Sequence, residues 1–463
     1  MLKKVFYLSA ITLLMPACDE PKLGVDESVD VTQISVRQIS PEMQKVRDYV
    51  PSMATIAHRG TTFWAPEETE SSFRWAREIG ADYIEADLQV TKDGIILALH
   101  DDDLRRTSNI EVYYGERVPQ SRKQYYIELG YSEAEAQAKL DADAANFMPY
   151  YTSFYTYSEL LMLDAGSWFN HDNPKQARDG FVGEYISTLE DLVQISKGKK
   201  LKRNADGTRV WSILGKTGDK VKSFSGEADV VEYAFEYVND DVYSGNVPGI
   251  YLEFKAPWLN PSDFEQRVYD ELDRLDMNII TKPESADAPL YVDGRVNIGN
   301  TNGKVILQTF STESLGRVND VYNGQVPMCF LLWPTGHAED PEGYASLIDL
   351  AVSEKAHIIG PCISGAPNDY PEMNYPWMDY LIEKAGMINH PYSFDSNDQM
   401  KKYFGDYNFG NEAEVLFNPP YLDAMFTNRS ELTIDFFINH NVRDEAAPTT
   451  VPNCNKLLDA LGY

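Results

Sequence analysis

The fold is decided by three apolar runs that carry ionisable residues at or near one end: Ala54-Thr55-Ile56-Ala57-His58-Arg59-Gly60, Tyr83-Ile84-Glu85-Ala86-Asp87-Leu88-Gln89-Val90 and Asp93-Gly94-Ile95-Ile96-Leu97-Ala98-Leu99-His100-Asp101. Short apolar runs bounded by turn signals are typical of buried strands. An α/β barrel or an open α/β sheet buries the sides of its strands and offers side chains at their carboxyl ends. We therefore predict an α/β fold in which these polar residues meet at the mouth.

A tight hairpin is predicted between the second and third runs. Asp93-Gly94 stands between them, and Asp-Gly between alternating runs is a strong turn signal. If the turn is centred just before Asp93, Glu85 falls opposite His100. Because side chains alternate between the two faces of a strand, Glu85, Asp87 and His100 would then share one face.

Five motifs follow one another between residues 58 and 107. They are His58-Arg59-Gly60, Pro66-Glu67-x-Thr69, Glu85-x-Asp87, Thr91-x-Asp93-Gly94 and His100-Asp101-x-x-Leu104-x-Arg106-Thr107. In this order and spacing they resemble the glycerophosphodiester phosphodiesterase family. The resemblance implies a TIM-type (β/α)8 barrel that hydrolyses glycerophosphodiesters to an alcohol and glycerol 3-phosphate, using one divalent cation and two histidines.

Three carboxylates are the candidate metal ligands. Glu85 and Asp87 form an i, i+2 pair, and Glu253 lies in the later apolar run Gly249–Lys255. Hydrolysis of a phosphodiester builds negative charge on oxygen, and hard carboxylate oxygens suit Ca²⁺ or Mg²⁺. By resemblance these three positions are the family's metal ligands, so we expect one divalent cation, Ca²⁺ or Mg²⁺.

Two histidines and two basic residues complete the expected machinery. His58 and His100 stand at the ends of different runs, and imidazole titrates near neutral pH, which suits an acid/base pair. Which of them is the acid stays open, as does direct attack by water against formation of a cyclic phosphate by the glycerol hydroxyl. Arg59 and Lys255 are expected to hold phosphate oxygens, although Lys255 could also pair with Glu253.

Two positions depart from the family pattern. Glu67 follows its Pro-Glu element and is a candidate substrate-binding residue, but Glu68 stands where asparagine is usual. Near the C-terminal end, His390-Pro391-Tyr392-Ser393 replaces the usual Trp-Thr. Tyr392 remains a candidate wall for the glycerol or the head group, so the preferred substrate is open.

Composition and charge limit the partners. The chain has 463 residues and a formal net charge of −31, which argues against a nucleic-acid partner because phosphates require the opposite sign. A small anionic substrate would need local cations. Cys329 and Cys362 could pair or could be buried free thiols on neighbouring strands.

Residues 1–18 are typical of a bacterial lipoprotein signal peptide. Lys3 and Lys4 precede an apolar run too short to span a bilayer, and Pro16-Ala17-Cys18 follows. We expect Cys18 to carry a lipid that anchors the protein in a bacterial cell envelope, facing the periplasm or exposed at the surface. Ordinary signal cleavage, which would give a secreted periplasmic protein, is the alternative.

The rest of the chain reads as one barrel. A polar tether and a short helix over 19–50 precede it, and the barrel itself spans 51–463 with insertions at about 108–158 and 197–248 over its mouth. Later strands are expected at Val305–Phe310, Met328–Trp333, His357–Pro361, Met387–Phe394 and Ala424–Asn428. Counted with the return strand of the hairpin, just before His100, nine segments are candidates for the eight strands of the barrel. We expect the return strand to be the extra one.

Two other functions fit the same residues. The tyrosine-rich first insertion and the membrane tether would also suit cleavage of intact lipid head groups, as a phospholipase does. A non-catalytic surface lipoprotein that binds phosphodiesters or glycans would use the insertions as its binding surface. The sequence leaves the oligomeric state open.

Overall fold

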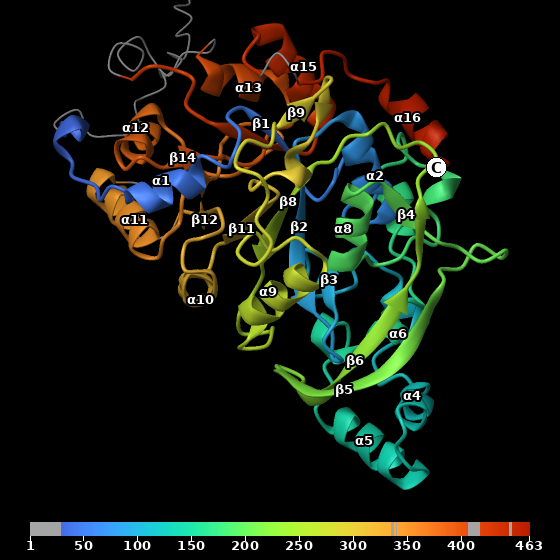
Figure 1. Ribbon diagram of the computed structural model, residues 1–463. Helices are drawn as coiled ribbons and strands as arrows, with labels where there is room; N and C mark the ends of the chain where they lie inside the picture. The colour runs from blue at the N-terminus through green and yellow to red at the C-terminus, as the bar shows by residue number, and fades with distance from the viewer. Residues whose placement is uncertain (1–28, 335–337, 339, 406–416, 444–446) are drawn as a thin grey trace, which may run out of the picture.

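The protein is described by a computed structural model that places all residues except 1–28, 335–337, 339, 406–416 and 444–446. Eight parallel strands form one nearly closed sheet (Figure 1), in the order β14-β13-β12-β11-β8-β2-β1-β15. Their bounds are β1 Ala54–Ala57, β2 Tyr83–Val90, β8 Gly249–Phe254, β11 Val305–Thr309, β12 Met328–Leu332, β13 Ile358–Pro361, β14 Ile388–Asn389 and β15 Ala424–Thr427. A parallel bridge from Phe394 to Thr427 joins the two edges beyond β14. The predicted barrel is confirmed.

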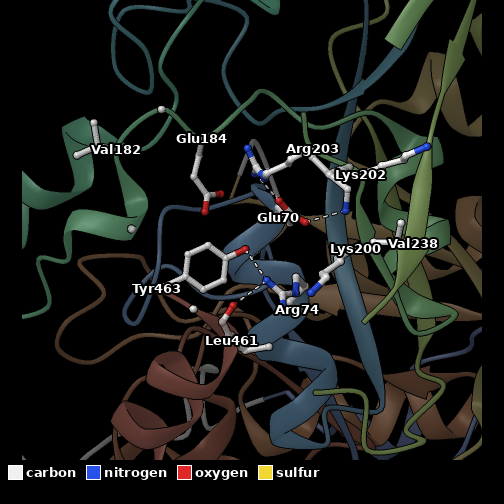
Figure 2. A pocket seen from close by; sticks show the side chains of 14 residues that line it. Glu70, Arg74, Val182, Glu184, Lys200, Lys202, Arg203, Val238, Leu461 and Tyr463 are labelled. Atoms are coloured by element: carbon white, nitrogen blue, oxygen red, sulfur yellow. Dashed lines mark hydrogen bonds and ion pairs between the residues drawn. The ribbon is translucent and has the colours of Figure 1, made fainter. Parts of the chain in front are cut away.

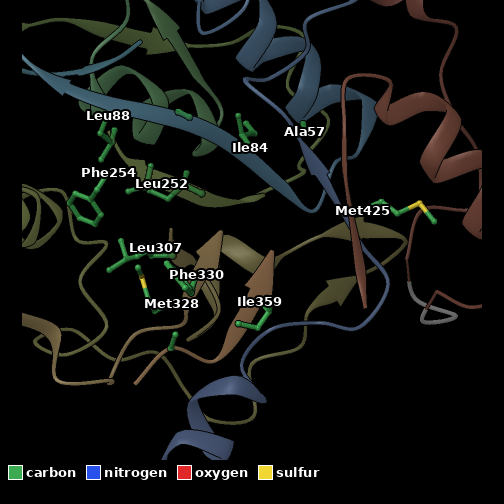
Figure 3. Packing of buried hydrophobic residues seen from close by; sticks show 14 of the residues in the cluster. Ala57, Ile84, Leu88, Leu252, Phe254, Leu307, Met328, Phe330, Ile359 and Met425 are labelled. Carbon is green, nitrogen blue, oxygen red and sulfur yellow. The ribbon is translucent and has the colours of Figure 1, made fainter. Parts of the chain in front are cut away.

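Alternate residues of each strand face two different apolar layers. On β8, Ile250 and Leu252 pack in the outer layer under the helices, whereas Tyr251 points into the barrel interior. Figure 3 shows the outer layer continuing through Leu307 and Phe330 on the next strands. Because the side-chain period of a strand is two residues, Glu253 follows Tyr251 on the interior side at the carboxyl end.

Helices surround the sheet, and several of them begin with a side-chain cap. Thr69 and Ser72 form a capping box at the start of α2 (Glu70–Ile79), and Gly80 ends this helix with φ +93°. The helices that follow along the barrel are α8 Leu189–Ser196, α9 Phe264–Arg274, α10 Thr312–Tyr322, α11 Pro341–Ser353, α12 Pro376–Lys384, α13 Asn397–Phe404, α15 Ser430–His440 and α16 Cys454–Leu461. These helices cover the outer apolar layer.

The hairpin return, β3 (Ile96–Ala98), pairs only with β2 in the sheet, so it is the surplus strand as predicted. Its register differs by one residue from our expectation, because Leu88 rather than Asp87 lies opposite Ala98. Gly94 has φ +92° and extends the loop by one residue, as in a three-residue hairpin with a bulge. The predicted pairing of Glu85 with His100 is therefore wrong.

The first insertion and residues 211–235 of the second pack on this hairpin and lie together at one end of the molecule (Figure 1). Residues 199–201 of the second insertion lie instead beside α2 and α8. The first contains α3 Ile110–Tyr113, α4 Arg122–Glu128, α5 Glu133–Ala145 and α6 Tyr157–Leu160, and the second contains β4 Lys199–Leu201, β5 Trp211–Ser223, β6 Gly226–Phe235 and β7 Tyr237–Asn239. The hydroxyls of Tyr125 and Tyr233, one from each insertion, donate to Asp93 Oδ2 at 3.0 and 2.6 Å. The backbone N–H of Tyr157 donates to Asp93 Oδ1. The turn aspartate therefore joins both insertions to the barrel.

The predicted tether is shorter than expected. Val31 and Ile39 are buried, and the Lys384 ammonium on α12 donates to the backbone carbonyls of Thr32 and Ile34. These apolar side chains hold residues 31–39 against the barrel before α1 (Pro41–Arg47) begins. The predicted signal peptide and Cys18 lie outside the described residues.

Two further observations concern membranes and cysteines. Among the placed residues, the helices are all too short or too polar to cross a bilayer. Cys329 and Cys362 are buried free thiols, so the pairing that the sequence left open is absent between them.

Candidate active site

Glu85, Asp87 and Glu253 meet at the carboxyl ends of two neighbouring strands. β2 and β8 are parallel, and their register sets Asp87 beside Glu253. One carboxylate oxygen from each residue lies within 4.8 Å of the others, and all three residues are buried. The i, i+2 pair Glu85 and Asp87 and the carboxylate that follows Asp87 by 166 positions are thus brought together as expected.

The residues present fit a hard divalent cation. Asp87 Oδ2 is buried without a hydrogen-bond donor. Burial and the neighbouring Asp87 charge raise the pKa of Glu85. Burial and Asp87 also raise the pKa of Glu253 to about 7, although Lys255 acts in the opposite direction. Lys255, His100 and Arg59 lower the pKa of Asp87 against the effect of burial. One carboxylate that keeps its charge beside two whose charge is disfavoured is a set of oxygen donors that suits Ca²⁺ or Mg²⁺.

Two cations border the carboxylates. Lys255 Nζ lies 2.9 Å from Glu253 Oε1 and 3.6 Å from Asp87 Oδ1, so the pairing with Glu253 that the sequence allowed is present. Arg59 Nε lies 3.2 Å from Asp87 Oδ2, and the Arg59 backbone N–H donates to Glu85 Oε2 at 2.7 Å. Both side chains reach the place where a phosphate would meet the carboxylates.

The tight turn after β1 aims Arg59 at the site. Arg59 and Gly60 both have positive φ, +52° and +76°. A Cβ on Gly60 would lie 2.8 Å from the backbone carbon of Ser72 in α2. Only glycine combines this backbone conformation with so close a contact.

Each candidate histidine is held through its Nδ1. His58 Nδ1 lies 2.7 Å from Asn428 Oδ1, beyond β15, and His100 Nδ1 lies 2.5 Å from Asp101 Oδ1. This leaves Nε2 of both rings as the nitrogen that can exchange a proton. Burial and the Arg59 cation lower the pKa of His58 to about 3. Burial also lowers the pKa of His100, against the opposing field of Asp87, so His100 lies within electrostatic reach of Asp87 despite the altered hairpin register.

Glu67 belongs to a chain of ion pairs that runs from Arg59 to His100. Its carboxylate accepts from Arg59 Nη1 at 3.1 Å and from Arg106 Nη2 at 2.5 Å. Arg106 Nε in turn donates to Asp101, the partner of His100. In the structure Glu67 therefore positions Arg59 and Arg106. The sequence motif contained Arg106 and Asp101, but gave no sign that they link the two sides of the site.

The departure at Glu68 has a physical explanation. Glu68 Oε1 accepts the backbone N–H of Asp87 at 2.7 Å. Burial and Asp87 raise the pKa of Glu68 well above the usual range for a carboxyl. The raised pKa favours the uncharged form of Glu68, which would add no charge beside the ligands, as with the asparagine that the family resemblance places there.

Gln308 and Asn428 were missed by the sequence reasoning. Gln308 lies beside Glu253 in the register of β11 with β8, and its amide donates to Glu85 Oε1 at 2.9 Å. Gln308 Oε1 is buried without a donor. The only local signal was that the polar residue Gln308 directly follows the apolar run Val305–Leu307 within a predicted strand. Asn428 stood at the end of a predicted strand, but its contact with His58 depends on closure of the barrel.

Tyr392 lies at the mouth, and its hydroxyl donates to the Leu332 carbonyl at 2.8 Å. His390 is fully buried inside the barrel, where its Nδ1 lies 3.3 Å from the Tyr251 hydroxyl. The two side chains of the His-Pro-Tyr-Ser segment therefore lie in different places. His390 packs in the barrel interior, and Tyr392 lies at the mouth.

A cavity of about 620 Å³ lies outside this constellation (Figure 2). Its lining includes Glu70, Arg74, Glu184 and Tyr463 but none of the site residues discussed above. Glu184 Oε1 is buried there without a hydrogen-bond partner. Burial and the nearby Glu70 raise the pKa of Glu184 to about 7.

A barrel of eight parallel strands whose ionisable side chains gather at the carboxyl ends defines a TIM-barrel enzyme. The model of the glycerophosphoryl diester phosphodiesterase family matches residues 58–243. The glycerophosphodiester phosphodiesterase of Bacillus subtilis is 24% identical over 349 residues, which cover 75% of this chain and 78% of that protein. The chain thus carries a glycerophosphoryl diester phosphodiesterase domain over residues 58–243 and is a phosphoric diester hydrolase.

Other relatives match a shorter part of the chain or have a lower sequence identity. Human glycerophosphodiester phosphodiesterase domain-containing protein 5 is 40% identical over 167 residues, 34% of this chain and 23% of the human protein. Among solved structures, an Oleispira antarctica phosphodiesterase in complex with the product sn-glycerol-3-phosphate is 15% identical, with a TM-score of 0.45 over 83% of this chain and 97% of that one. A glycerophosphodiester phosphodiesterase from Agrobacterium tumefaciens has a TM-score of 0.43 at 16% identity, over 83% of this chain and 99% of that one.

Proposed function

We propose that the protein hydrolyses glycerophosphodiesters to an alcohol and glycerol 3-phosphate, with one divalent cation, Ca²⁺ or Mg²⁺, and a pair of histidines. The observation that carries the proposal is the cluster of Glu85, Asp87 and Glu253, with oxygens within 4.8 Å of one another. Arg59 and Lys255 border the same cluster. Carboxylates that could bind a cation thus lie next to basic side chains that could bind a phosphate.

The basic side chains would bind and orient the substrate. Arg59 offers a planar fork of donors to phosphate oxygens, and Lys255 offers a point charge. Glu67 holds the Arg59 guanidinium in place through Nη1. A divalent cation held by the three carboxylates would polarise the phosphoryl group and stabilise the charge that develops on oxygen.

The partners of the two histidines favour different proton roles. Asp101 is an anion and stabilises the charged form of His100, so His100 is the better donor to the leaving oxygen. Asn428 is neutral, and the Arg59 cation disfavours a charge on His58. His58, neutral with Nε2 unprotonated, would accept the proton of the attacking hydroxyl.

The experiment is to measure glycerol 3-phosphate release from several glycerophosphodiesters, with and without a chelator. Activity should fall at least a hundredfold with chelator and return on addition of Ca²⁺ or Mg²⁺. Glu253→Gln should lose the cation-dependent activity and the rise in melting temperature that the cation produces, whereas Glu184→Gln, a buried carboxyl outside the site, should keep both. Undiminished activity without metal would refute the role of the carboxylates.

We also propose that Cys18 carries a lipid that anchors the protein in a bacterial cell envelope. The support is the basic start, the short apolar run and the small residue before Cys18. The Cys18→Ala variant should move from the membrane fraction to the soluble fraction. If wild-type protein is soluble and begins after an ordinary cleavage site, the anchor is wrong.

A further inference from the structure

Four aromatic rings form an arc on one side of the barrel mouth. Phe310, Trp333, Tyr370 and Tyr392 follow β11, β12, β13 and β14, four strands that are neighbours in the sheet. Consecutive rings are in contact: the centroids of Phe310 and Tyr392 are 5.7 Å apart, those of Tyr392 and Tyr370 6.3 Å, and those of Tyr370 and Trp333 5.1 Å. The interplanar angles are 89°, 59° and 69°, so the rings present faces in several directions.

The arc begins at the end of β11, the strand that contacts the carboxylate cluster through Gln308. Phe310 lies two residues beyond Gln308, whose amide contacts Glu85, and residues i and i+2 of an extended chain share a face. Burial raises the pKa of Tyr370 against the field of Arg59, and burial together with Cys362 and Glu253 raises that of Tyr392. The arc is therefore within electrostatic reach of both the phosphate-binding arginine and a candidate metal ligand.

The rings are open to solvent at the two ends of the arc. Phe310 is 40% exposed and Trp333 is 44% exposed, whereas Tyr370 and Tyr392 are half-buried. Tyr392 is fixed by its hydrogen bond to the Leu332 carbonyl. The arc is thus a set of mutually contacting, partly exposed rings, one of which is held by a hydrogen bond, on the side of the mouth where β11 to β14 end.

We propose that this aromatic arc binds the cationic head group of the substrate, an amine of the choline type. A cation within about 6 Å of a ring centroid is attracted by the negative face of the ring, and several rings together select quaternary ammonium groups. Two carboxylates, Asp369 and Asp395, also act on Tyr370, against the Arg59 cation on the phosphate side, and Asp369 is exposed beside the ring. The proposal rests on the proposed hydrolysis of glycerophosphodiesters and names the head group that is released.

The test compares two substrates that share glycerol 3-phosphate and differ in the charge of the head group. Trp333→Leu should lower kcat/KM for glycerophosphocholine about tenfold and leave that for glycerophosphoglycerol within about twofold. Trp333→Phe, which keeps a ring, should restore most of the loss. Tyr113→Leu removes a ring of similar exposure, 46%, from the first insertion and should change neither value.

Binding of choline provides a readout that does not need turnover. By calorimetry, choline should bind the wild-type protein, and the Kd should rise about tenfold in Trp333→Leu. If neither diester is hydrolysed but choline binding follows the ring, the proposed function fails and the head-group site stands. If both diesters are hydrolysed and Trp333→Leu affects them equally, or choline does not bind, the arc is a general apolar wall and the proposal is overturned.

Discussion

The side-chain amide of Gln308 donates a hydrogen bond of 2.9 Å to Glu85 Oε1 across the barrel interior. This bond fixes one carboxylate of the candidate metal cluster from a strand, β11, that carries none of the three ligands. Loss of a partner that orients a ligand in this way typically lowers metal affinity about 10- to 100-fold.

Gln308→Leu should therefore weaken cation binding. The variant keeps the approximate volume but loses the donor, so we expect the cation concentration for half-maximal activity to rise about 10- to 100-fold. The measurement is a Mg²⁺ or Ca²⁺ titration of glycerol 3-phosphate release, with the melting temperature as a check on folding. An unchanged titration curve would show that Gln308 does not act on the metal site.

Asp101→Asn should shift the pH dependence of the reaction. The amide can still accept from His100 Nδ1, but it no longer stabilises the imidazolium, so the pKa of His100 should fall further. If His100 is the acid, the alkaline limb of the pH–rate profile moves to lower pH by about one unit. Asp172→Asn, which alters the exposed pair of His171 and Asp172, is the matched control. A shift of the acid limb instead would reverse the two histidine roles.

Glu184 should make the protein less stable as the pH rises. Its folded pKa of about 7 exceeds the usual 4.5, so the folded state holds a proton that the unfolded chain has released. This stabilisation is complete below pH 4.5 and is lost as the pH rises through 7. The free energy of unfolding should fall by an amount on the order of 3 kcal/mol between about pH 4.5 and 8.

Glu184→Gln should flatten this dependence in chemical denaturation at several pH values. Glu133→Gln, an exposed carboxyl at the start of α5, should leave the slope as in the wild type. Equal slopes for wild-type protein and Glu184→Gln would contradict the raised pKa.

Gly60→Ala should destabilise the protein and disturb the site together. The residue combines φ +76° with a Cβ position 2.8 Å from the Ser72 backbone, so we expect about 2–4 kcal/mol of destabilisation and at least a tenfold loss of activity as Arg59 moves. Gly115→Ala has a similar φ of +64° and nothing within 4 Å, and it should cost only about 1 kcal/mol. Equal costs would show that the close contact with α2 is unimportant.

The strands and most of the site could be predicted because their signals are local. The apolar runs that contain His58, Asp87 and Glu253 each combine buried apolar residues with an ionisable residue within a few positions. The register of the β2–β3 hairpin could not be predicted, because it depends on whether Gly94 adds a residue to the loop. The extra loop residue shifts the register by one position, so Glu85 does not lie opposite His100.

The residues that position the site were harder to predict because they act across strands. Gln308 reaches Glu85 from 223 positions away in sequence, and Asn428 reaches His58 from 370 positions away. Neither contact leaves a local pattern, since both arise from the order of strands around the barrel. The length of the tether was overestimated for a similar reason, because the apolar Val31 and Ile39 find their cover on α12 and its neighbours.

Asp93 lies at the tip of a turn, yet its carboxylate accepts the Tyr125 and Tyr233 hydroxyls and the Tyr157 backbone N–H. Deleting either insertion alone would remove at least one hydrogen-bond donor from this buried carboxylate, a change that proteins tolerate poorly. The two insertions therefore depend on each other. A related protein that lacks one of them would be expected to lack the other as well, or to carry a different residue in place of Asp93.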